Sequence, residues 1–306
     1  MAISVCAISG QSWELATEPG CSVGGVKAAL EAAAGIPARE QRLIAGVAEA
    51  VDEAADAETV LKLAQARFFT LLRRNPEEAL WLERLEKMAF PQDALRRAPS
   101  EIKANRAVML SVVNRHGYSL KLASQELRDD HEVVLAAVSQ AGAALEYASE
   151  ELRGQRDVVL AAVRSCGGAL KHASAILRDD REVVLAAIAS HAGALRFASE
   201  DLRADADVVC TAGLKDGASL EYASEGLLGE RDLVHRVVSR HGYALRYASA
   251  ELRGDWEVVL SAVAQDGSAL KHAQGALLAD SEFIRKATLV NEFASDFNSP
   301  ALVVAN

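Results

Sequence analysis

The chain has 306 residues, half of them apolar and a quarter charged, a composition usual for proteins with packed cores. Its formal net charge of −10 argues against broad binding of phosphate groups but leaves room for a local basic strip. No stretch approaches roughly 18 uncharged apolar residues, and the first residues lack the pattern of a secretory signal. We therefore expect neither a membrane span nor secretion.

The residue types of common catalytic and metal sites are scattered along the chain. The four cysteines form no CxxC pair, which favours reduced thiols and a cytoplasmic or nuclear protein. The seven histidines form no HxxxH or HExxH motif, and neither a GxSxG motif nor a phosphate-binding glycine loop is present. We expect no enzymatic activity, no metal and no cofactor.

Residues 1–75 have the pattern of a small mixed α/β domain. Alternating apolar residues predict two strands joined by a turn at Ser9-Gly10, and Ser22 and Gly35 are placed to begin and end a helix. The expected elements are strands over 3–8 and 13–17, a helix over 22–34, and strands over 41–44 and 67–72. This order is β-grasp-like.

The same segment resembles ubiquitin. The resemblance rests on the helix sequence Ser22–Leu30, the following Gly35-Ile-Pro bend, the Gln41-Arg-Leu-Ile44 strand and the closing Leu71-Leu72-Arg73-Arg74. It implies a ubiquitin-like fold over residues 1–74, and it suggests a eukaryotic or eukaryote-associated source.

The resemblance also implies a binding patch and sets limits on conjugation. Ile8 and Ile44 match two members of the apolar patch of ubiquitin, and the third member falls at Phe68, Thr70 or a neighbouring residue. The alternative is that these are ordinary strand residues without a partner. Arg74 leads into more protein instead of Gly-Gly, so conjugation through this terminus is not expected.

Residues 76–101 are predicted to be a helical linker and degenerate first repeat. Asn75-Pro76 is suited to begin a helix, because proline lacks the amide hydrogen that the first helical turn cannot use. We expect tandem helical repeats over 102–280, followed by a capping helix and tail over 281–306.

A motif of the form Ala-Leu-x-aromatic-Ala-Ser recurs every 25 residues without an insertion. Its leucines are Leu120, Leu145, Leu170, Leu195, Leu220, Leu245 and Leu270. Equal units in tandem predict a solenoid, in which each repeat buries its apolar face against its neighbours.

Each repeat is predicted to contain two helices. Asp130 and its equivalents are suited to cap the first helix, an acid two residues later opposes the helix dipole, and Gly142 is expected to end the helix in a left-handed conformation. The second helix is expected from about Ala144 to Leu152, and the arginine after it is expected to pair with first-turn acids or carbonyls. The overall prediction is α+β and all-α: a β-grasp domain followed by an α-α solenoid.

The repeat pattern resembles the family named domain of unknown function 4116. The shared residues are Asp-x-Glu-Val-Val-Leu-Ala-Ala-Val, then Gly-x-Ala-Leu-x-Tyr-Ala-Ser and Leu-Arg, which fit best in the repeats from 127 to 201. The resemblance implies a helical repeat and assigns no activity.

Two ladders on the second helix are the candidate binding residues. An aromatic ladder could hold a peptide or stack bases, and a mainly basic ladder beside it could bind an acidic peptide. The alternatives are packing between repeats and a solvated face. The candidates are Lys121, Tyr147, Lys171, His172, Arg196, Phe197, Tyr222, Arg246, Tyr247 and Lys271.

These features favour a non-catalytic protein–protein adaptor. Its ubiquitin-like module would bind ubiquitin-pathway or proteasome receptors, and its array would bind a second protein. The alternative is a nucleic-acid-binding repeat protein that uses both ladders, which the acidic net charge disfavours.

Overall fold

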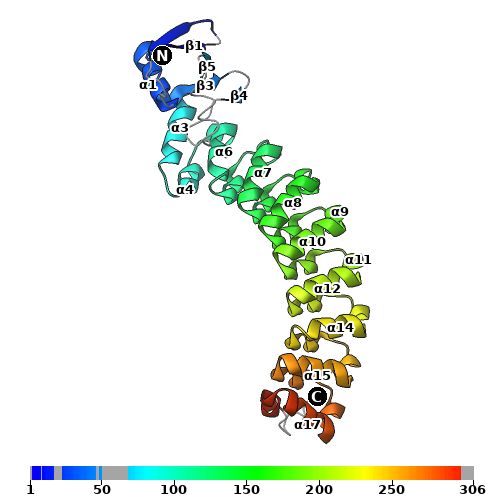
Figure 1. Cartoon of the computed structure of the whole chain (residues 1–306). Coiled ribbons are helices and arrows are strands. Elements are labelled where there is room, and N and C mark those ends of the chain that lie inside the picture. Colours follow the sequence, from blue (N-terminus) through cyan, green and yellow to red (C-terminus); the bar gives the residue numbers. More distant parts are fainter. Residues whose placement is uncertain (1, 8, 17–22, 46–47, 50–67, 298–306) are drawn as a thin grey trace. The chain divides into compact units, whose positions relative to one another are not determined.

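The computed structural model describes residues 2–7, 9–16, 23–45, 48–49 and 68–297. The chain divides into an N-terminal unit, Met1–Ser111, and a C-terminal unit, Val112–Asn306. The N-terminal unit contains a small sheet followed by helices, and the C-terminal unit is a helical array (Figure 1). The fold is therefore α+β followed by an all-α solenoid, as predicted.

A five-stranded mixed sheet forms the first part of the N-terminal unit. Its strand order is β2-β1-β5-β3-β4; β1 and β5 are parallel and the other pairs are antiparallel. This topology is compatible with a ubiquitin-like β-grasp. The elements are β1 (Ala2–Ala7), β2 (Ser12–Ala16), α1 (Val23–Ala34), the 3-10 helix η1 (Ala38–Glu40), β3 (Gln41–Ala45), β4 (Ala48–Glu49) and β5 (Phe68–Arg73).

Apolar side chains from the strands pack against α1. The buried core consists of Ile3, Val5, Leu15, Val26, Leu30, Leu43, Phe69 and Leu71. Gly35 ends α1 with a φ of +67°, a conformation that glycine adopts without steric cost. The Gln41 side-chain amide then fixes the bend by donating to the carbonyls of Lys27 and Ile36 at 2.9 and 2.7 Å.

Most of the elements predicted in this segment are confirmed. The hairpin, the helix ending at Gly35 and the strands at Gln41 and Phe68 are present, whereas the two-residue strand β4 was not predicted. The predicted helix cap Ser22 lies outside the described residues.

Four helices follow the sheet. Asn75 caps the first by accepting a hydrogen bond from the Glu77 amide at 2.8 Å, and Pro76 occupies its first turn as predicted. The helices are α3 (Pro76–Glu86), α4 (Pro91–Arg96), α5 (Ser100–Lys103) and α6 (Arg106–Val113), the last of which contains the boundary between the units.

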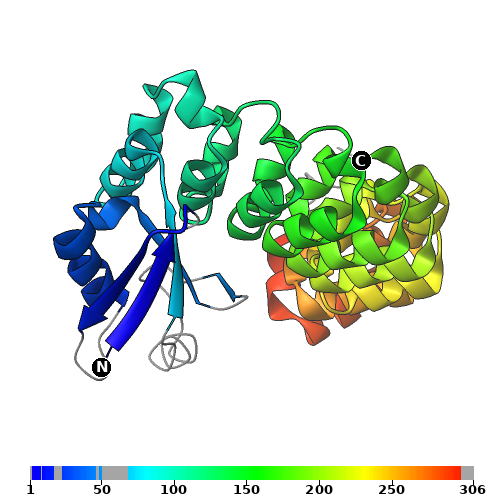
Figure 2. The same ribbon diagram turned by 90° about the horizontal axis from the view of Figure 1, so that it is seen from above.

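In the C-terminal unit the longest helix of each repeat stacks on the equivalent helix of the next. Figure 1 shows these helices in chain order, and in Figure 2 they lie one behind another. Their apolar pair and the residues one turn later, such as Val133, Val134, Ala137 and Val138, are fully buried. They are α7 (His131–Gln140), α8 (Arg156–Ser165), α10 (Arg181–Ser190), α12 (Ala206–Lys215), α14 (Arg231–Val238), α15 (Trp256–Gln265) and α17 (Ser281–Val290).

The predicted second helix is wrong, because that segment is broken in two. A six-residue 3-10 helix ends where Ala148 adopts extended φ and ψ of −67° and 156° and its amide donates to Leu145. The 3-10 helices are η2 (Gly117–Leu122), η3 (Gly142–Tyr147), η5 (Gly167–His172), η6 (Ala192–Phe197), η7 (Gly217–Tyr222), η8 (Gly242–Tyr247), η10 (Gly267–His272) and η11 (Glu292–Phe297). One short turn follows in each repeat: η4 (Leu152–Gly154), α9 (Ala175–Arg178), α11 (Glu200–Arg203), α13 (Glu225–Leu228), η9 (Leu252–Gly254) and α16 (Gly275–Leu278).

The extended residues at this break connect the repeats through their backbones. The Ser149 amide donates to the Arg128 carbonyl of the preceding repeat at 2.9 Å. The same bond recurs at each later junction, with lengths of 2.8 to 3.0 Å, from Ser174 to Arg153, Ser199 to Arg178, Ser224 to Arg203, Ser249 to Leu228 and Gln274 to Arg253. A continuous second helix would use these amides internally, so the break is what makes them available to the neighbouring repeat.

The repeat glycines do not have the left-handed conformation that we predicted. Among the described residues only Gly10 and Gly35 have positive φ. Instead, a Cβ on Gly142 would lie 2.1 Å from the Ala162 carbonyl oxygen of the next repeat. Equivalent contacts at 2.3 Å occur at Gly117, Gly167 and Gly242. Close backbone approach between repeats therefore explains the glycine at these four positions.

The amide of this glycine is also bound by the next repeat. A side chain 23 residues later accepts its hydrogen: Gln140 from Gly117 at 2.7 Å, and Ser165 from Gly142 at 3.1 Å. Ser190 and Gln265 do the same for Gly167 and Gly242. Glycine and its acceptor thus form one contact that fixes the spacing of adjacent repeats.

We predict that Gly142→Ala destabilises the array by about 1–3 kcal/mol, because the added methyl group has no space against Ala162. Thermal unfolding monitored by circular dichroism should show the midpoint falling by several degrees. Gly226→Ala is the matched control, since no atom lies within 4 Å of a Cβ there. Equal midpoints for the two variants would contradict the close-approach explanation.

Candidate functional site: the repeat strip

The predicted ladders form the candidate site together with the arginine that follows them. We call this surface the repeat strip. Each repeat contributes three positions to it. The charged position contains Lys121, Glu146, Lys171, Arg196, Glu221, Arg246 and Lys271, and the aromatic position, one residue later, contains Leu122, Tyr147, His172, Phe197, Tyr222, Tyr247 and His272. The arginine position contains Arg128, Arg153, Arg178, Arg203 and Arg253, with Leu228 in one repeat. All charged-position residues are exposed and all aromatic-position residues are half-buried.

The 3-10 geometry places the first two positions at the end of each 3-10 helix, directly before the extended alanine. The adjacent side chains then contact each other. The Arg196 guanidinium lies 4.3 Å from the centroid of the Phe197 ring, and that of Arg246 lies 5.0 Å from the centroid of Tyr247. These cation–π contacts hold the cation against a half-buried ring while its outer surface stays in solvent.

The arginine position behaves differently from our prediction. The Nε atoms of Arg128, Arg153, Arg178, Arg203 and Arg253 are all buried, and none has a hydrogen-bond partner. Their backbone carbonyls accept the inter-repeat bond, but their side chains pair with neither the first-turn acids nor the cap carbonyls. A buried donor without an acceptor lowers the stability of the fold, and here such a donor recurs in five repeats.

The arginine of one repeat lies close to the aromatic position of the next. Burial lowers the pKa of His172 most, followed by Lys171; Glu146 acts in the opposite direction, and Arg153 of the preceding repeat lowers the pKa further. Burial also lowers the pKa of His272, followed by Lys271, Arg246 and Arg253. The Nε2 atom of His172 is buried and likewise has no partner. The cationic Arg153 of one repeat and the His172 imidazole of the next therefore lie close together in the strip.

The strip is strongly basic although the chain is acidic. It carries ten lysine and arginine side chains against the two acids Glu146 and Glu221. At the first of these acids the pKa of Tyr147 is raised, mainly by burial and then by Glu146. The acids divide the basic side chains into short groups along the array.

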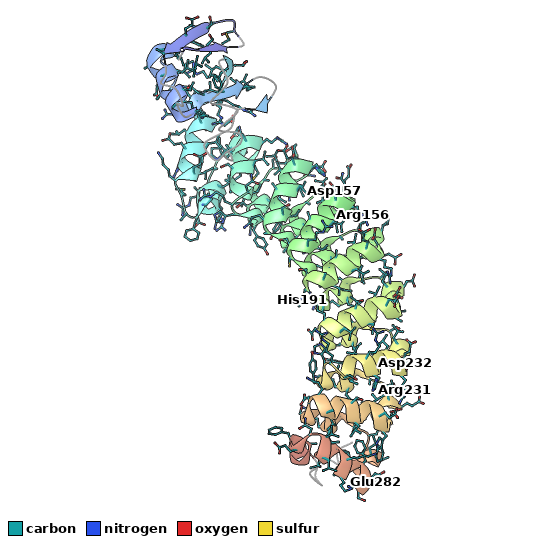
Figure 3. The ribbon with its side chains drawn as sticks, viewed as in Figure 1. Arg156, Asp157, His191, Arg231, Asp232 and Glu282 are labelled. Atoms are coloured by element: carbon teal, nitrogen blue, oxygen red, sulfur yellow. The ribbon has the colours of Figure 1, made fainter. Side chains whose placement is uncertain are left out.

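The first-turn acids lie at a different place, along the edge where the longest helices begin. Figure 3 shows Arg156, Asp157, Arg231, Asp232 and Glu282 along this edge, with His191 at the opposite one. Several of the acid pairs there are bound by an arginine that is the first residue of the preceding repeat's helix. Arg231 binds Asp255 at 3.0 Å and also Glu257, and Arg156 binds Asp180 at 3.1 Å and also Glu182.

This pairing explains why the acids do not neutralise the strip. His131 binds Asp157 at 2.7 Å and Arg181 binds Asp205 at 3.5 Å, so the same connection runs through other repeats. The partners of Asp157, Asp180, Asp205 and Asp255 are thus residues at the start of a neighbouring long helix, not residues of the strip.

The residues of the predicted ubiquitin-like patch are partly brought together. Ile44 of β3 and Thr70 of β5 are direct partners in the sheet register, and both are half-buried. Phe68 begins the same strand, where its backbone is paired with Ser4 of β1. Ile8 lies outside the described residues.

The repeat geometry corresponds to one family profile. The profile described as domain of unknown function (DUF4116) matches residues 105–153, 155–203, 180–228 and 230–277, which together cover more than half of the chain. The chain belongs to the DUF4116 family. Comparisons with curated proteins and with solved structures give no significant match. The DUF4116 assignment thus establishes the repeat and leaves its activity open.

Two further properties concern the described residues alone. No group of three or more His, Cys, Asp or Glu side chains is placed to hold a metal ion within the described ranges. None of the helices described for this DUF4116 chain combines the length and apolar character needed to cross a membrane.

Sequence analysis missed the glycine contact, its acceptor and the unpartnered arginines. A signal for the acceptor is present, because Gln140, Ser165, Ser190 and Gln265 follow a repeat glycine by 23 residues. No comparable signal identifies the buried Nε atoms. The sequence shows only that an arginine follows a leucine, and such an arginine could equally well pair with nearby acids.

We predict that Arg153→Met and Arg178→Met leave the thermal midpoint unchanged or raise it. Methionine keeps the aliphatic packing of the side chain and removes the unpartnered donor. Ser165→Ala is the control and should lower stability by roughly 1–3 kcal/mol, because it removes the acceptor of the Gly142 amide. If the arginine variants unfold as early as this control, the arginines are structural.

Proposed function

We propose that this chain is a non-catalytic interaction scaffold whose repeat strip binds an extended acidic segment of another protein. The observation that carries the proposal is the set of five buried, unpartnered arginine Nε atoms. A bound carboxylate would pair with the guanidinium groups of these arginines, which are half-buried and so remain partly accessible. Helical-repeat arrays commonly bind partners along such extended surfaces.

The order of charges along the strip favours a protein segment over a nucleic acid. A nucleic acid has a phosphate at every nucleotide, and such a chain would pass Glu146 and Glu221 at unfavourable cost. In addition, two of the aromatic rings, Phe197 and Tyr247, already have a guanidinium over one face, which limits base stacking. An acidic peptide can place neutral residues opposite the two glutamates.

The finer proposal is an adaptor linked to the ubiquitin–proteasome pathway, in the cytoplasm or nucleus. Its support is the resemblance of residues 1–74 to ubiquitin, the compatible sheet topology, and the position of Ile44 beside Thr70. In this arrangement the N-terminal module would bind a ubiquitin-pathway or proteasome receptor. The repeat strip would bind the second protein.

The strip proposal predicts binding of a fluorescein-labelled 20-residue peptide of Glu, Asp, Gly and Ser, measured by anisotropy. Affinity should fall as salt is raised, because the contacts are charged. Arg153→Met combined with Arg178→Met should weaken binding at least tenfold. Arg156→Met combined with Arg231→Met is the matched control, because these two arginines lie at the starts of long helices and pair with acids there. This control should not weaken binding.

Two outcomes of this titration would overturn the proposal. Tighter binding of a 20-nucleotide single-stranded DNA or RNA would replace it with nucleic-acid binding. Equal binding by the strip variants and the unmodified chain would show that the strip is not the binding surface.

The ubiquitin-pathway proposal predicts that full-length protein captures proteasome or ubiquitin-receptor subunits from a eukaryotic lysate. Ile44→Ala should abolish this capture, because Ile44 is a half-buried strand residue with part of its side chain accessible. Glu14→Ala, an exposed substitution on β2, is the control. Capture that survives Ile44→Ala, or the absence of such subunits, would contradict the proposed role of this patch.

A further inference from the structure

A cleft on the helices that follow the sheet is a second candidate surface, separate from the repeat strip. It has a volume of about 660 Å³ and is formed by α3, the connection after it and α4. Its apolar lining includes Trp81, Met88 and Phe90. This volume falls within the range of roughly 300–1,000 Å³ that is usual for ligand-binding clefts.

The amino-acid sequence leaves apolar side chains on the outside of these helices. Helix α3 buries Ala79, Leu82 and Leu85, which form its inward face. Leu80 nevertheless remains 54% exposed, and Phe90, at the start of α4, is 66% exposed. An apolar surface beyond what packing requires is characteristic of a binding site.

Three arginines surround this apolar lining. Arg84 lies over Trp81, with its guanidinium carbon 5.2 Å from the ring centroid, and Arg96 and Arg97 line the cleft from the end of α4. Asp93 is the one acid in the lining. Among the described residues, no ion pair involves any of the three arginines, so their charges are available to a ligand.

We propose that this cleft binds a short acidic segment of a partner protein that inserts an aromatic or long aliphatic side chain beside Trp81 and Phe90. The carboxylates of the segment would bind Arg84, Arg96 and Arg97. Arg84 comes from α3, whereas Arg96 and Arg97 come from the end of α4, and positive charge from two helices suits several carboxylates along a peptide. Arginine beside tryptophan is also a combination enriched in protein-binding hot spots.

The cleft can be observed independently of the strip through Trp81. The full-length chain with Trp13→Phe and Trp256→Phe retains Trp81 as its single tryptophan. The probe is a ten-residue peptide with six Asp and Glu residues around a central Phe-Leu pair. Binding should shift the emission of Trp81 to shorter wavelength, since the inserted side chains exclude water from the ring.

Matched peptides and variants define the specificity. A peptide with Ser-Ser in place of Phe-Leu should bind at least tenfold more weakly, and a lysine version should not bind. Arg84→Gln combined with Arg97→Gln should weaken binding at least tenfold, and Phe90→Ser should do so without removing charge. Circular dichroism should show that each variant retains the helical content and thermal midpoint of its parent.

Several results would overturn the proposal. One is a Trp81 emission that does not respond to the acidic Phe-Leu peptide, and another is equal binding of the Ser-Ser or lysine peptide. A third is protection of Trp81 from acrylamide quenching in the free chain, which would mean that the cleft is already covered. Arg153→Met combined with Arg178→Met should leave the Trp81 response unchanged, so failure at the strip and failure at the cleft are distinguishable.

Discussion

Close approach between the backbones of adjacent repeats is the constraint on which the array depends. At Gly117, Gly142, Gly167 and Gly242 a main-chain carbonyl of the next repeat occupies the space where any other residue would have its Cβ. Contact at this distance needs small side chains around it, which is consistent with the many alanines and with an aromatic content of only 5%. One repeat has Ala192 at the glycine position, and the long helix of the next repeat has Gly213 where the other long helices have valine, isoleucine or, in α17, threonine. The two departures from the pattern thus occur at the same junction.

Because the distance between repeats is fixed, side chains at the same position of successive repeats form a line along the array. The break at Ala148 contributes to this in two ways. It exposes the backbone amides that bind the preceding repeat, and it ends the 3-10 helix directly after the two ladder residues. The charged and aromatic side chains therefore leave the backbone at the same point in each repeat. An extended surface that grows with the number of repeats is the physical result.

The separation of charge follows from helix direction. Acids are concentrated where the longest helices begin, because the helix dipole and the amides of the first turn stabilise them there. Arginine at the start of the preceding helix then binds the same acids, although such exposed pairs contribute little to stability. These acids are thus paired at the starts of the long helices, and the strip has more basic than acidic residues in a chain with a net charge of −10. The cleft on α3 and α4 reaches a similar combination of arginine and aromatic residues within a short segment, without repetition.

The sequence by itself determined the elements that depend on local chemistry and on periodicity. The 25-residue spacing established the solenoid, the caps at Asp130 and Asp180 are present, and the Gly35 bend was predicted correctly because its left-handed conformation is a local property. Tertiary structure decided what depends on a neighbouring repeat. The close contact at Gly142 and the inter-repeat hydrogen bond at the Ala148 break both involve atoms about 20 residues away in the sequence, and the burial of the arginine Nε atoms is likewise a property of the folded array. A glycine after a helix is compatible with both a left-handed stop and a close contact, and only the position of the next repeat distinguishes between them.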